Sequence, residues 1–260
     1  MYQLFPPSEH LKDVVRYFWL LDFRTKNCHL TEYIFAYPYV NWVFTLGAPY
    51  TVKEIAKRDW TIQDTRILGP RTNLAEYVHP SGNLALGVTF QMGSTVSLFR
   101  NTTGSLTNQL ISQEDLLPSH QWLTPYFHEA SVESFIATLE VQLARLSNTP
   151  QAKGHTAWLQ FLELLGKPEN FSSSAYSLAQ ELKISPRQLQ RISSTFSGLP
   201  PKQIQSIIRC RMAVRQILQS GNMTDFFHYG YYDQNHFIRE VKRWARQTPA
   251  KLIEKLQAVS

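Results

Sequence analysis

The chain has only two cysteines, Cys28 and Cys210, among its 260 residues. They lie in different halves and form no Cys-x-x-Cys pair, so the sequence supports neither a disulfide framework nor a zinc knuckle. We expect both to be reduced structural residues.

No apolar run approaches the roughly 20 residues of a membrane span, and the first residues lack the basic start and long apolar stretch of a signal peptide. We therefore expect a protein of the cytoplasm or nucleoid that binds no membrane.

Common catalytic signatures are also missing. The sequence contains no Gly-rich phosphate loop, no Gly-x-Ser-x-Gly elbow and no paired-carboxylate signature. The histidines of the first half are scattered and more typical of surface or hydrogen-bonded side chains than of ligands. They are His10, His29, His79, His120 and His128. We expect no catalytic residue, no metal and no cofactor, and hence a protein that is not an enzyme.

The charge is unevenly distributed. Residues 1–150 hold 11 Lys and Arg against 13 Asp and Glu, a net charge of −2, whereas residues 151–260 hold 15 against 7, a net charge of +8. This asymmetry favours a C-terminal part that binds a polyanion, although a merely soluble basic surface gives the same count.

The first half of the chain is typical of β-strands. Short aromatic and β-branched runs are separated by turn residues, a spacing that suggests a sandwich or small barrel. The expected strands are Val14–Leu21, Glu32–Tyr37, Val40–Leu46, Leu74–His79 and Leu84–Phe90. A helix is predicted over Ser131–Leu146, where Leu139, Leu143 and Leu146 either pair with a second copy of the chain or pack on the strands.

Asn148–Gly154 has the composition of a linker, and the residues after it are helical in pattern. The helix predicted over His155–Leu165 places Trp158, Leu159, Leu162 and Leu165 on one face. The other expected helices are Ser177–Lys183, Pro186–Phe196, Lys202–Ser220, Thr224–Tyr229 and Gln234–Arg246. We therefore expect an α+β protein of two domains, β-rich over residues 1–148 and all-α over residues 155–256.

Residues 177–250 carry one pattern twice, at an offset of 48 residues. Each copy holds a helix-capping side chain, an apolar residue, an arginine, an aromatic residue and a proline. The copies are Ser185, Leu189, Arg191, Phe196 and Pro201, then Asp233, Phe237, Arg239, Trp244 and Pro249. Two short capped helices joined by a long one predict two recognition helices at a fixed separation. A connecting helix of about 18 residues spans roughly 27 Å, which suits neighbouring major grooves about 34 Å apart.

Both short helices place long polar side chains opposite their apolar stripe. Arg with guanine and Gln or Asn with adenine are the favoured base contacts, and basic residues further along suit phosphates. The residues expected to contact double-stranded DNA are Ser185, Arg187, Gln188, Gln190, Arg191, Ser194, Asp233, Gln234, Asn235, Arg239, Lys242 and Arg243. The alternative is the solvated surface of an ordinary helical bundle, but the duplication and the basic excess favour DNA.

The segment Ser177–Ile253 resembles the double helix-turn-helix domain of AraC/XylS-type transcriptional regulators. Its first unit, SLAQELKISPRQLQRISSTFSGLPPKQI, is similar to the pattern S-L-A-x-x-L-x-x-S-x-x-x-L-x-R-x-F. Its second, GYYDQNHFIREVKRWARQTPAKL, is similar to the more diagnostic G-[FY]-x-[DS]-x-[SH]-x-F-x-R-x-F-[KR]-x-x-x-G-x-[TS]-P. The resemblance implies DNA contact by Arg187, Gln190, Arg191, Gln234, Asn235 and Arg239. It also implies RNA polymerase as a partner if the protein is an activator.

The second unit departs from this pattern. Phe226 and Phe227 stand where an apolar residue and an alanine are usual, Val241 replaces a phenylalanine, and Gln247 stands for the glycine after the helix. The second unit is therefore expected to dock less deeply than the first, or to contact mainly phosphates. The first departs less, with Ser193 where an aromatic residue is common.

The N-terminal part resembles the β-rich sensor domains attached to such regulators. The pieces that carry the resemblance are PPSEHLKDVVRYFWLL, ILGPRTNLAEYVHPSGNLALGVTFQMGSTVSLF and LTNQLISQEDLLP, with Met92 replacing the proline of the run L-G-V-x-F-x-P-x-G. The resemblance implies a cupin-like barrel that binds a small effector, forms a homodimer, or both. Metal-dependent barrels of this kind need His-x-His with a later Glu and His, which this chain lacks.

The dense aromatic residues of this part either fill the core or line an effector pocket. The residues expected at such a pocket are Tyr17, Trp19, Tyr33, Phe35, Trp42, Phe44 and Arg71. The whole pattern predicts a sequence-specific DNA-binding regulator controlled by a small molecule. The alternatives are an interaction protein whose altered helix-turn-helix modulates another regulator, and a barrel enzyme regulated by its helices.

Overall fold

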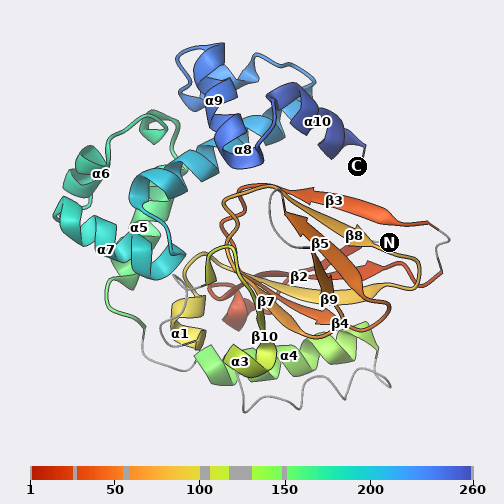
Figure 1. Ribbon diagram of the computed structural model, residues 1–260. Helices are drawn as coiled ribbons and strands as arrows, with labels where there is room; N and C mark the ends of the chain where they lie inside the picture. Colours follow the sequence, from red (N-terminus) through yellow and green to blue (C-terminus); the bar gives the residue numbers. More distant parts are fainter. Residues whose placement is uncertain are drawn as a thin grey trace.

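The computed structural model describes residues 2–25, 28–54, 59–99, 106–116, 131–147 and 151–258, and its strands form two antiparallel sheets (Figure 1). The six-stranded sheet has the order β1 (Tyr2–Phe5), β2 (Val15–Asp22), β9 (Leu84–Phe90), β4 (Asn41–Thr45), β7 (Arg66–Leu68) and β10 (Leu110–Ser112). The four-stranded sheet has the order β3 (Leu30–Ile34), β8 (Ala75–His79), β5 (Tyr50–Glu54) and β6 (Trp60–Ile62). The α+β class is confirmed, but the expected barrel is an open pair of sheets.

Alternation along the strands directs side chains to two different cores. In β4, Val43 packs between the two sheets with Tyr50 and Tyr77, whereas Trp42 and Phe44 point to the opposite face. That face is covered by α4 (Val132–Ser147), and Figure 1 shows α4 running beneath the six-stranded sheet. The strand alternation therefore separates an inter-sheet layer from a helix-covered layer.

Helix α4 packs on the sheet through its apolar stripe. Leu139 and Leu143 are completely buried in the same cluster as Trp42 and Phe44, and Leu146 packs partly against it. Of the two expected roles for this helix, packing on the strands is the one observed, since its leucines are already covered within the chain.

The helices after residue 154 gather around the long helix α8 (Pro201–Ser220), whereas the short helices α1 (Thr95–Phe99) and α3 (Gln113–Leu116) lie beside the sheets near α4 (Figure 1). In chain order the helices of the described residues are η1 (Glu9–Leu11), α1, α3, α4, α5 (His155–Leu165), η4 (Pro168–Asn170), α6 (Ala175–Glu181), α7 (Pro186–Ser197), α8, η5 (Asp225–Tyr229), α9 (Gln234–Ala245) and α10 (Pro249–Gln257). The domain boundaries at residues 148 and 155 remain predictions, and residues 148–150 lie outside the described chain.

Helix α5 buries most of the face its sequence suggested, but not all of it. Trp158 and Leu165 are buried as expected, whereas Leu159 is 49% exposed and Phe161 and Leu164 are buried in addition. The apolar residues of this helix extend beyond one stripe, so helical periodicity alone does not choose between them. The choice comes from the neighbouring α7, where the Phe196 ring stacks on Trp158 with centroids 5.7 Å apart.

Candidate nucleic-acid interface and ligand cavity

The two copies of the sequence repeat fold as α7 and α9, and each begins at its expected cap. The Ser185 hydroxyl accepts a hydrogen bond from the backbone NH of Gln188, and the Asp233 carboxylate accepts one from the NH of His236. Each cap satisfies one of the unpaired NH groups that open a helix. The prolines that end each copy, Pro201 and Pro249, occupy the first turns of the following helices α8 and α10.

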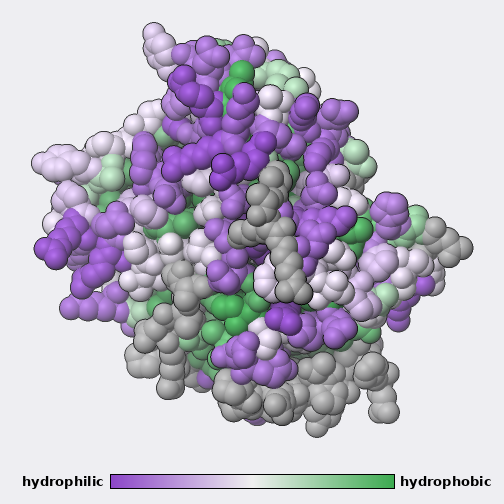
Figure 2. All heavy atoms as spheres, in the orientation of Figure 1, coloured by the Kyte–Doolittle hydropathy of each residue, from purple (hydrophilic) through white to green (hydrophobic). Residues whose placement is uncertain are grey.

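The polar faces of both helices are open to solvent. In α7 the exposed residues are Arg187, Gln188, Gln190, Arg191 and Ser194, and in α9 they are Gln234, Asn235, Arg239, Lys242 and Arg243. Ser185 is exposed and Asp233 half-buried, as their capping roles require. Figure 2 shows hydrophilic side chains over the regions of α7 and α9. Neither face is buried against the sheets.

Most cations on these faces lack a partner within the described chain. No ion pair among the described residues involves Arg187, Arg191, Arg239 or Lys242. Arg243 lies over the Trp244 ring, 4.7 Å from its centroid. The two helices therefore present uncompensated positive charge beside amide side chains, a composition suited to phosphates and base edges.

The small residue at Ser193 is explained by hydrogen bonding in the first unit. Ser193 is completely buried, and its hydroxyl donates to the carbonyl of Leu199 at 2.6 Å. Ser197 donates in turn to the carbonyl of Ser193 at 2.7 Å. These bonds satisfy backbone carbonyls where the chain leaves α7, so a serine replaces the packing of an aromatic side chain.

The second unit accommodates its two phenylalanines through a tighter first helix. Residues Asp225–Tyr229 form the 3₁₀ helix η5, in which Phe226 is buried and Phe227 is 51% exposed. The Phe226 ring stacks on Phe237 of α9, with centroids 4.8 Å apart and planes 10° apart. Only one of the two rings has to enter the core, which explains how α9 docks without the usual alanine.

Helix α9 is also tied to α8 by a buried ion pair. Arg209 donates two hydrogen bonds to the carboxylate of Glu240, and its third nitrogen donates to the carbonyl of Phe171 at 3.1 Å. Tyr231 donates to the same carboxylate at 2.7 Å. Both charged side chains are at most 10% exposed. The second recognition helix is therefore held in place by specific polar contacts as well as by packing.

The residue that leaves α9 in the left-handed conformation is Arg246, with φ of 55°. The family resemblance placed the glycine that usually ends this helix at Gln247, one residue later. Arg246 lies 48 residues after Gly198, which caps α7 at φ of 72°, so the duplication includes this backbone feature.

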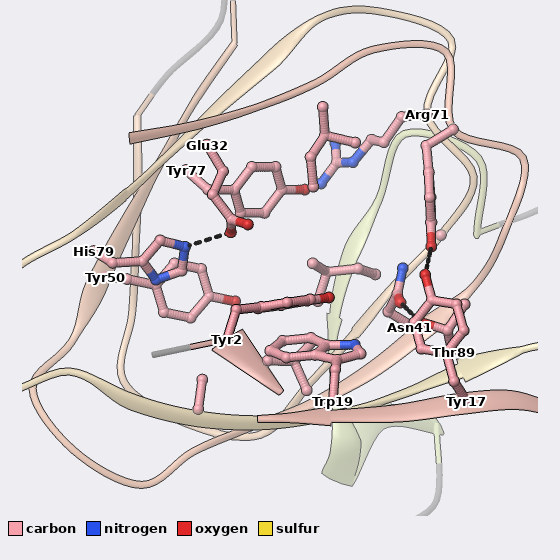
Figure 3. Close-up of a pocket in the computed structure, with 16 residues that line it drawn as sticks. Tyr2, Tyr17, Trp19, Glu32, Asn41, Tyr50, Arg71, Tyr77, His79 and Thr89 are labelled. Carbon is pink, nitrogen blue, oxygen red and sulfur yellow. Dashed lines mark hydrogen bonds and ion pairs between the residues drawn. The ribbon is translucent and has the colours of Figure 1, made fainter. Parts of the chain in front are cut away.

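A cavity of about 140 Å³ opens between the two sheets (Figure 3). Tyrosine and tryptophan rings form much of its wall, with other polar groups distributed around it. The lining residues are Tyr2, Tyr17, Trp19, Glu32, Ile34, Tyr37, Asn41, Val43, Tyr50, Leu68, Gly69, Arg71, Tyr77, His79, Ala85 and Thr89. A concave apolar pocket with a few fixed polar groups is the usual form of a small-molecule site.

Three of the seven residues expected at a pocket line this cavity: Tyr17, Trp19 and Arg71. Trp42 and Phe44 do not, because alternation turns them to the core beneath α4. Tyr33 and Phe35 do not either, because they face the C-terminal helices from β3 and from the residue after it. Successive residues of a strand point to opposite faces of the sheet, but only the packed structure shows which face borders the cavity.

A histidine with contacts at both ring nitrogens forms one side of the cavity. The His79 ring lies between two oxygen acceptors, with Nε2 3.0 Å from the Glu32 carboxylate and Nδ1 3.0 Å from the Asn83 side-chain oxygen. Asn83 donates its amide NH₂ to the carbonyl of Ala48, which turns its oxygen toward His79. Contacts at both ring nitrogens fix the orientation of the imidazole at the cavity wall.

Tyrosines form the opposite side of the cavity and connect it to the helices. The Tyr17 and Tyr37 hydroxyls are 3.2 Å apart, and burial raises the pKa of Tyr37 well above its usual value. The guanidinium of Arg211 from α8 lies 5.0 Å from the Tyr37 ring centroid and donates to the carbonyl of Phe35 at 2.8 Å. One residue therefore lines the cavity on one side and contacts the long helix on the other.

Sequence reasoning missed several residues at both sites. Tyr50, Tyr77 and His79 line the cavity, but β5 was not recognised as a strand and His79 was taken only as a surface or hydrogen-bonded histidine. In the helical part, Lys202 and His236 line a hollow beside Arg243. The 48-residue repeat does not predict that these two side chains line a hollow, because the hollow forms only when α8 and α9 pack together. His120 and His128 lie outside the described residues.

Across the described ranges, no three His, Cys, Asp or Glu side chains are grouped so that they could hold a metal ion. None of the described helices is long and apolar enough to span a bilayer. Both cysteines are free, with Cys28 exposed and Cys210 buried.

Two protein families match separate parts of the chain. Residues 3–112 match a family described as a domain of unknown function, DUF6597, and residues 178–255 match a helix-turn-helix domain family. No curated protein sequence matches the chain.

Similar solved structures include ToxT from Vibrio cholerae O395, at 11% identity over 89% of this chain and 97% of that chain, with a TM-score of 0.48. They also include unsaturated-fatty-acid-bound ToxT from Vibrio cholerae strain SCE256, at 11% identity over 90% and 95% of the two chains, with a TM-score of 0.47. The AraC-like transcriptional activator CuxR is 13% identical over 83% and 78%, with a TM-score of 0.27.

The helix-turn-helix match covers both copies of the repeat, and both exposed basic faces lie within it. Residues 178–255 are thus an AraC-type helix-turn-helix domain, and the chain that carries it is a DNA-binding transcriptional regulator.

Proposed function

We propose that this regulator reads a specific DNA sequence with the outer faces of α7 and α9 and that a small molecule in the inter-sheet cavity controls it. The observation that carries the DNA-reading part is the repeat itself. Two capped helices of the same design expose Arg, Gln and Asn side chains, and α8 joins them. With 20 residues, α8 spans about 30 Å, close to the roughly 34 Å between successive major grooves.

The two faces divide into base-reading and backbone-contacting parts. Arg187, Gln190 and Arg191 in α7 and Gln234, Asn235 and Arg239 in α9 occupy the first two turns, from which a recognition helix reaches base edges. Lys242 and Arg243 come later on α9 and are suited to phosphates. Ser185, Gln188, Ser194 and Asp233 lie at the edges of these faces, where short side chains contact the sugar-phosphate backbone.

Control by a cavity ligand requires a physical connection to the DNA-binding helices, and Tyr37 and Arg211 supply one. A ligand that displaces Tyr37 changes the contact between Arg211 and the residues around Phe35, and so changes the free energy of packing α8 on the sheets. Couplings of this kind are typically about 1–3 kcal/mol.

The Arg211 route is tested by hydrogen exchange in the full-length protein. We expect Arg211→Ala to accelerate amide exchange in residues 33–37 and in the facing turns of α8, because the desolvated hydrogen bond to the Phe35 carbonyl is lost. Arg215→Ala is the matched control, since Arg215 is exposed one turn further along α8. Unchanged exchange in Arg211→Ala, or equal acceleration in both variants, would contradict the connection.

DNA binding is tested by selecting bound sites from random DNA and measuring their affinity as a function of salt. A protein that makes about six phosphate contacts loses roughly a thousandfold in affinity between about 50 and 200 mM salt. We expect Arg191→Ala and Arg239→Ala each to weaken specific binding by about 1–3 kcal/mol, with the larger loss for Arg191. Arg24→Ala serves as the control, because Arg24 is an exposed residue that pairs locally with Asp22 after β2.

Unchanged affinity in both recognition-helix variants would refute the assignment of the reading faces. Salt-independent or absent DNA binding by the wild type would instead favour the interaction-protein interpretation. A homodimer and contact with RNA polymerase by an activator stay predictions. A homodimer would have to use a surface other than the buried leucines of α4.

A further inference from the structure

Arg71 is a buried cation whose hydrogen-bonding capacity is only partly used. It is 2% exposed, and its Nη1 donates to the carboxylate of Glu54. Its Nε and Nη2 have no hydrogen-bond partner among the described residues. An unsatisfied buried donor costs about 1–3 kcal/mol, and more when it is charged. The side chain is one of those that line the cavity between the sheets.

The two unpartnered nitrogens form the side-on edge of the guanidinium. Their N–H bonds are parallel, and this edge accepts a carboxylate in a two-bond, planar contact. Glu54 holds the guanidinium from Nη1 and so leaves that edge available. In Figure 3 the guanidinium lies beside the hydroxyl of Tyr77 at one wall of the cavity. Burial raises the pKa of Tyr77, and both the charge of Arg71 and its side-chain contact with the Tyr77 hydroxyl oppose that rise.

A second unsatisfied group faces the same space. The hydroxyl of Tyr50 is buried and has no hydrogen-bond partner among the described residues. The ring is fixed by stacking on His79, with centroids 5.1 Å apart. Burial raises the pKa of Tyr50, so the hydroxyl stays protonated and can donate a hydrogen bond.

The size and walls of the cavity suit one planar ring. A closed apolar cavity on the order of 150 Å³ accommodates benzene, and this cavity measures about 140 Å³. Tyr2 and Trp19 form a stacked floor, with planes 22° apart. Trp19 lies flat because it is paired with Gly87 on β9, where a Cβ would come within 2.1 Å of the indole.

Charge sets the number of acidic groups on the ligand. Of the residues that line the cavity, Arg71 keeps unused donors beside its ion pair with Glu54, whereas His79 already contacts Glu32 and Asn83. A second carboxylate on the ligand would lie in a small space beside the negative charge of Glu32 and would be repelled. The unused donors of Arg71 form one edge that holds one carboxylate, so the site suits a single acidic group.

We propose that the cavity binds a small planar monocarboxylate one ring in size, with its carboxylate on Nε and Nη2 of Arg71, its ring against Tyr2, which stacks on Trp19, and the Tyr50 hydroxyl as a further donor. This inference rests on the proposed function only in taking the cavity as the effector site. Binding itself is measurable without DNA.

The first experiment compares probes on the full-length protein by calorimetry and thermal shift. Benzoate, benzamide and cyclohexanecarboxylate share a six-membered ring and differ in charge or planarity. We expect benzoate to bind saturably and to raise the melting temperature. Benzamide should bind at least about tenfold more weakly, because it lacks the charge for Arg71. Cyclohexanecarboxylate should also bind more weakly than benzoate, because its ring is not flat against Tyr2.

The second experiment uses variants whose stability and affinity should change in different directions. Tyr50→Phe removes an unsatisfied buried hydroxyl, so the free protein should be at least as stable as the wild type while benzoate affinity falls about 3–10-fold. Arg71→Gln should abolish the preference for benzoate over benzamide. Arg71→Gln also removes the ion pair with Glu54. If this loss prevents the variant from folding, Tyr50→Phe and the probe series still test the proposed ligand class. Arg24→Gln is the charge-matched control and should bind as the wild type does.

The inference is overturned if none of the ring carboxylates binds saturably, if benzamide binds as tightly as benzoate, or if Tyr50→Phe leaves benzoate affinity unchanged. Salt-dependent DNA binding in the same preparations separates the two conclusions. Its survival alongside a negative probe series rejects the ligand class alone, whereas its loss rejects the proposed function.

Discussion

The left-handed residue at the end of each recognition helix differs in chemistry between the two units. Gly198 adopts this conformation after α7, and Arg246 adopts it after α9. A residue with a Cβ meets steric repulsion at positive φ, at a cost of roughly 1–2 kcal/mol, whereas glycine does not. Both residues donate their NH to the helix end, Gly198 to Ser194 and Arg246 to Lys242. The hydrogen bond is therefore kept in both units, and the strain is present only in the second.

Arg246→Gly should raise the free energy of unfolding by about 0.5–1 kcal/mol, because it relieves that strain at the price of some chain entropy. The reciprocal change, Gly198→Ala, introduces the strain into the first unit and should lower stability by about 1 kcal/mol. Urea unfolding of both variants measures the difference. A loss of stability in Arg246→Gly would mean that the arginine side chain contributes more than its backbone conformation costs.

At the scale of elements, α9 depends on a polar anchor that α7 lacks. The Arg209–Glu240 pair, with Tyr231 and the Phe171 carbonyl, joins α9 to α8 and to the turn after η4. The Arg209 guanidinium also lies over the Tyr231 ring, 4.5 Å from its centroid. With a shortened η5 beside it, α9 has less helical packing around it, and this network fixes its position.

Glu240→Leu should destabilise the protein by about 3–5 kcal/mol, because it leaves the Arg209 charge buried without its partner. The double variant Arg209→Met, Glu240→Leu removes both charges and should lose much less than the sum of the single variants. Chemical unfolding of the four proteins completes the cycle. Additive losses would show that the two side chains act independently.

At the scale of the whole molecule, the sheets and the helices meet at the end of β9. The indole NH of Trp158 in α5 donates to the carbonyl of Met92 at 2.8 Å. Gly93, at φ of 88°, lies so close to this contact that a Cβ would come within 2.4 Å of the Trp158 nitrogen. Trp158 also stacks on Phe196 of α7, so this one side chain contacts both the end of β9, a strand of the cavity, and the first recognition helix. The same hydrophobic cluster includes Phe35 and Leu74 from the sheet region together with the C-terminal helices.

Gly93→Ala should therefore weaken the joint between the sheets and the helices. Gly82→Ala is the matched control, because Gly82 has a similar φ of 82° but its nearest non-neighbouring atom is 3.5 Å from the new Cβ. Both variants carry the backbone strain, and only Gly93→Ala displaces Trp158. We expect Gly93→Ala to lose about 2–4 kcal/mol more than the control. Calorimetry should show one unfolding transition in the wild type and two in Gly93→Ala, and equal traces for the two variants would contradict this role of Gly93.

The two candidate sites differ in how far local sequence predicts them. The caps at Ser185 and Asp233, the buried stripes of α7 and α9 and their polar faces all follow from residues within one or two helical turns. The cavity does not, because its Arg71, Tyr50 and His79 come from separate segments that meet only when the sheets pair. Trp42 and Phe44 show the consequence, since their chemistry suits a pocket and their strand face places them in the core.

The amino-acid sequence alone determined the helical repeat, its caps and its excess of positive charge, because helix formation and capping depend on neighbours three or four residues apart. Only the tertiary structure decided which aromatic residues enclose the cavity, which arginine is left with unused donors, and where β9 contacts α5. These properties depend on the pairing of strands distant in the chain, and on which strand face the helices cover, neither of which a local pattern encodes.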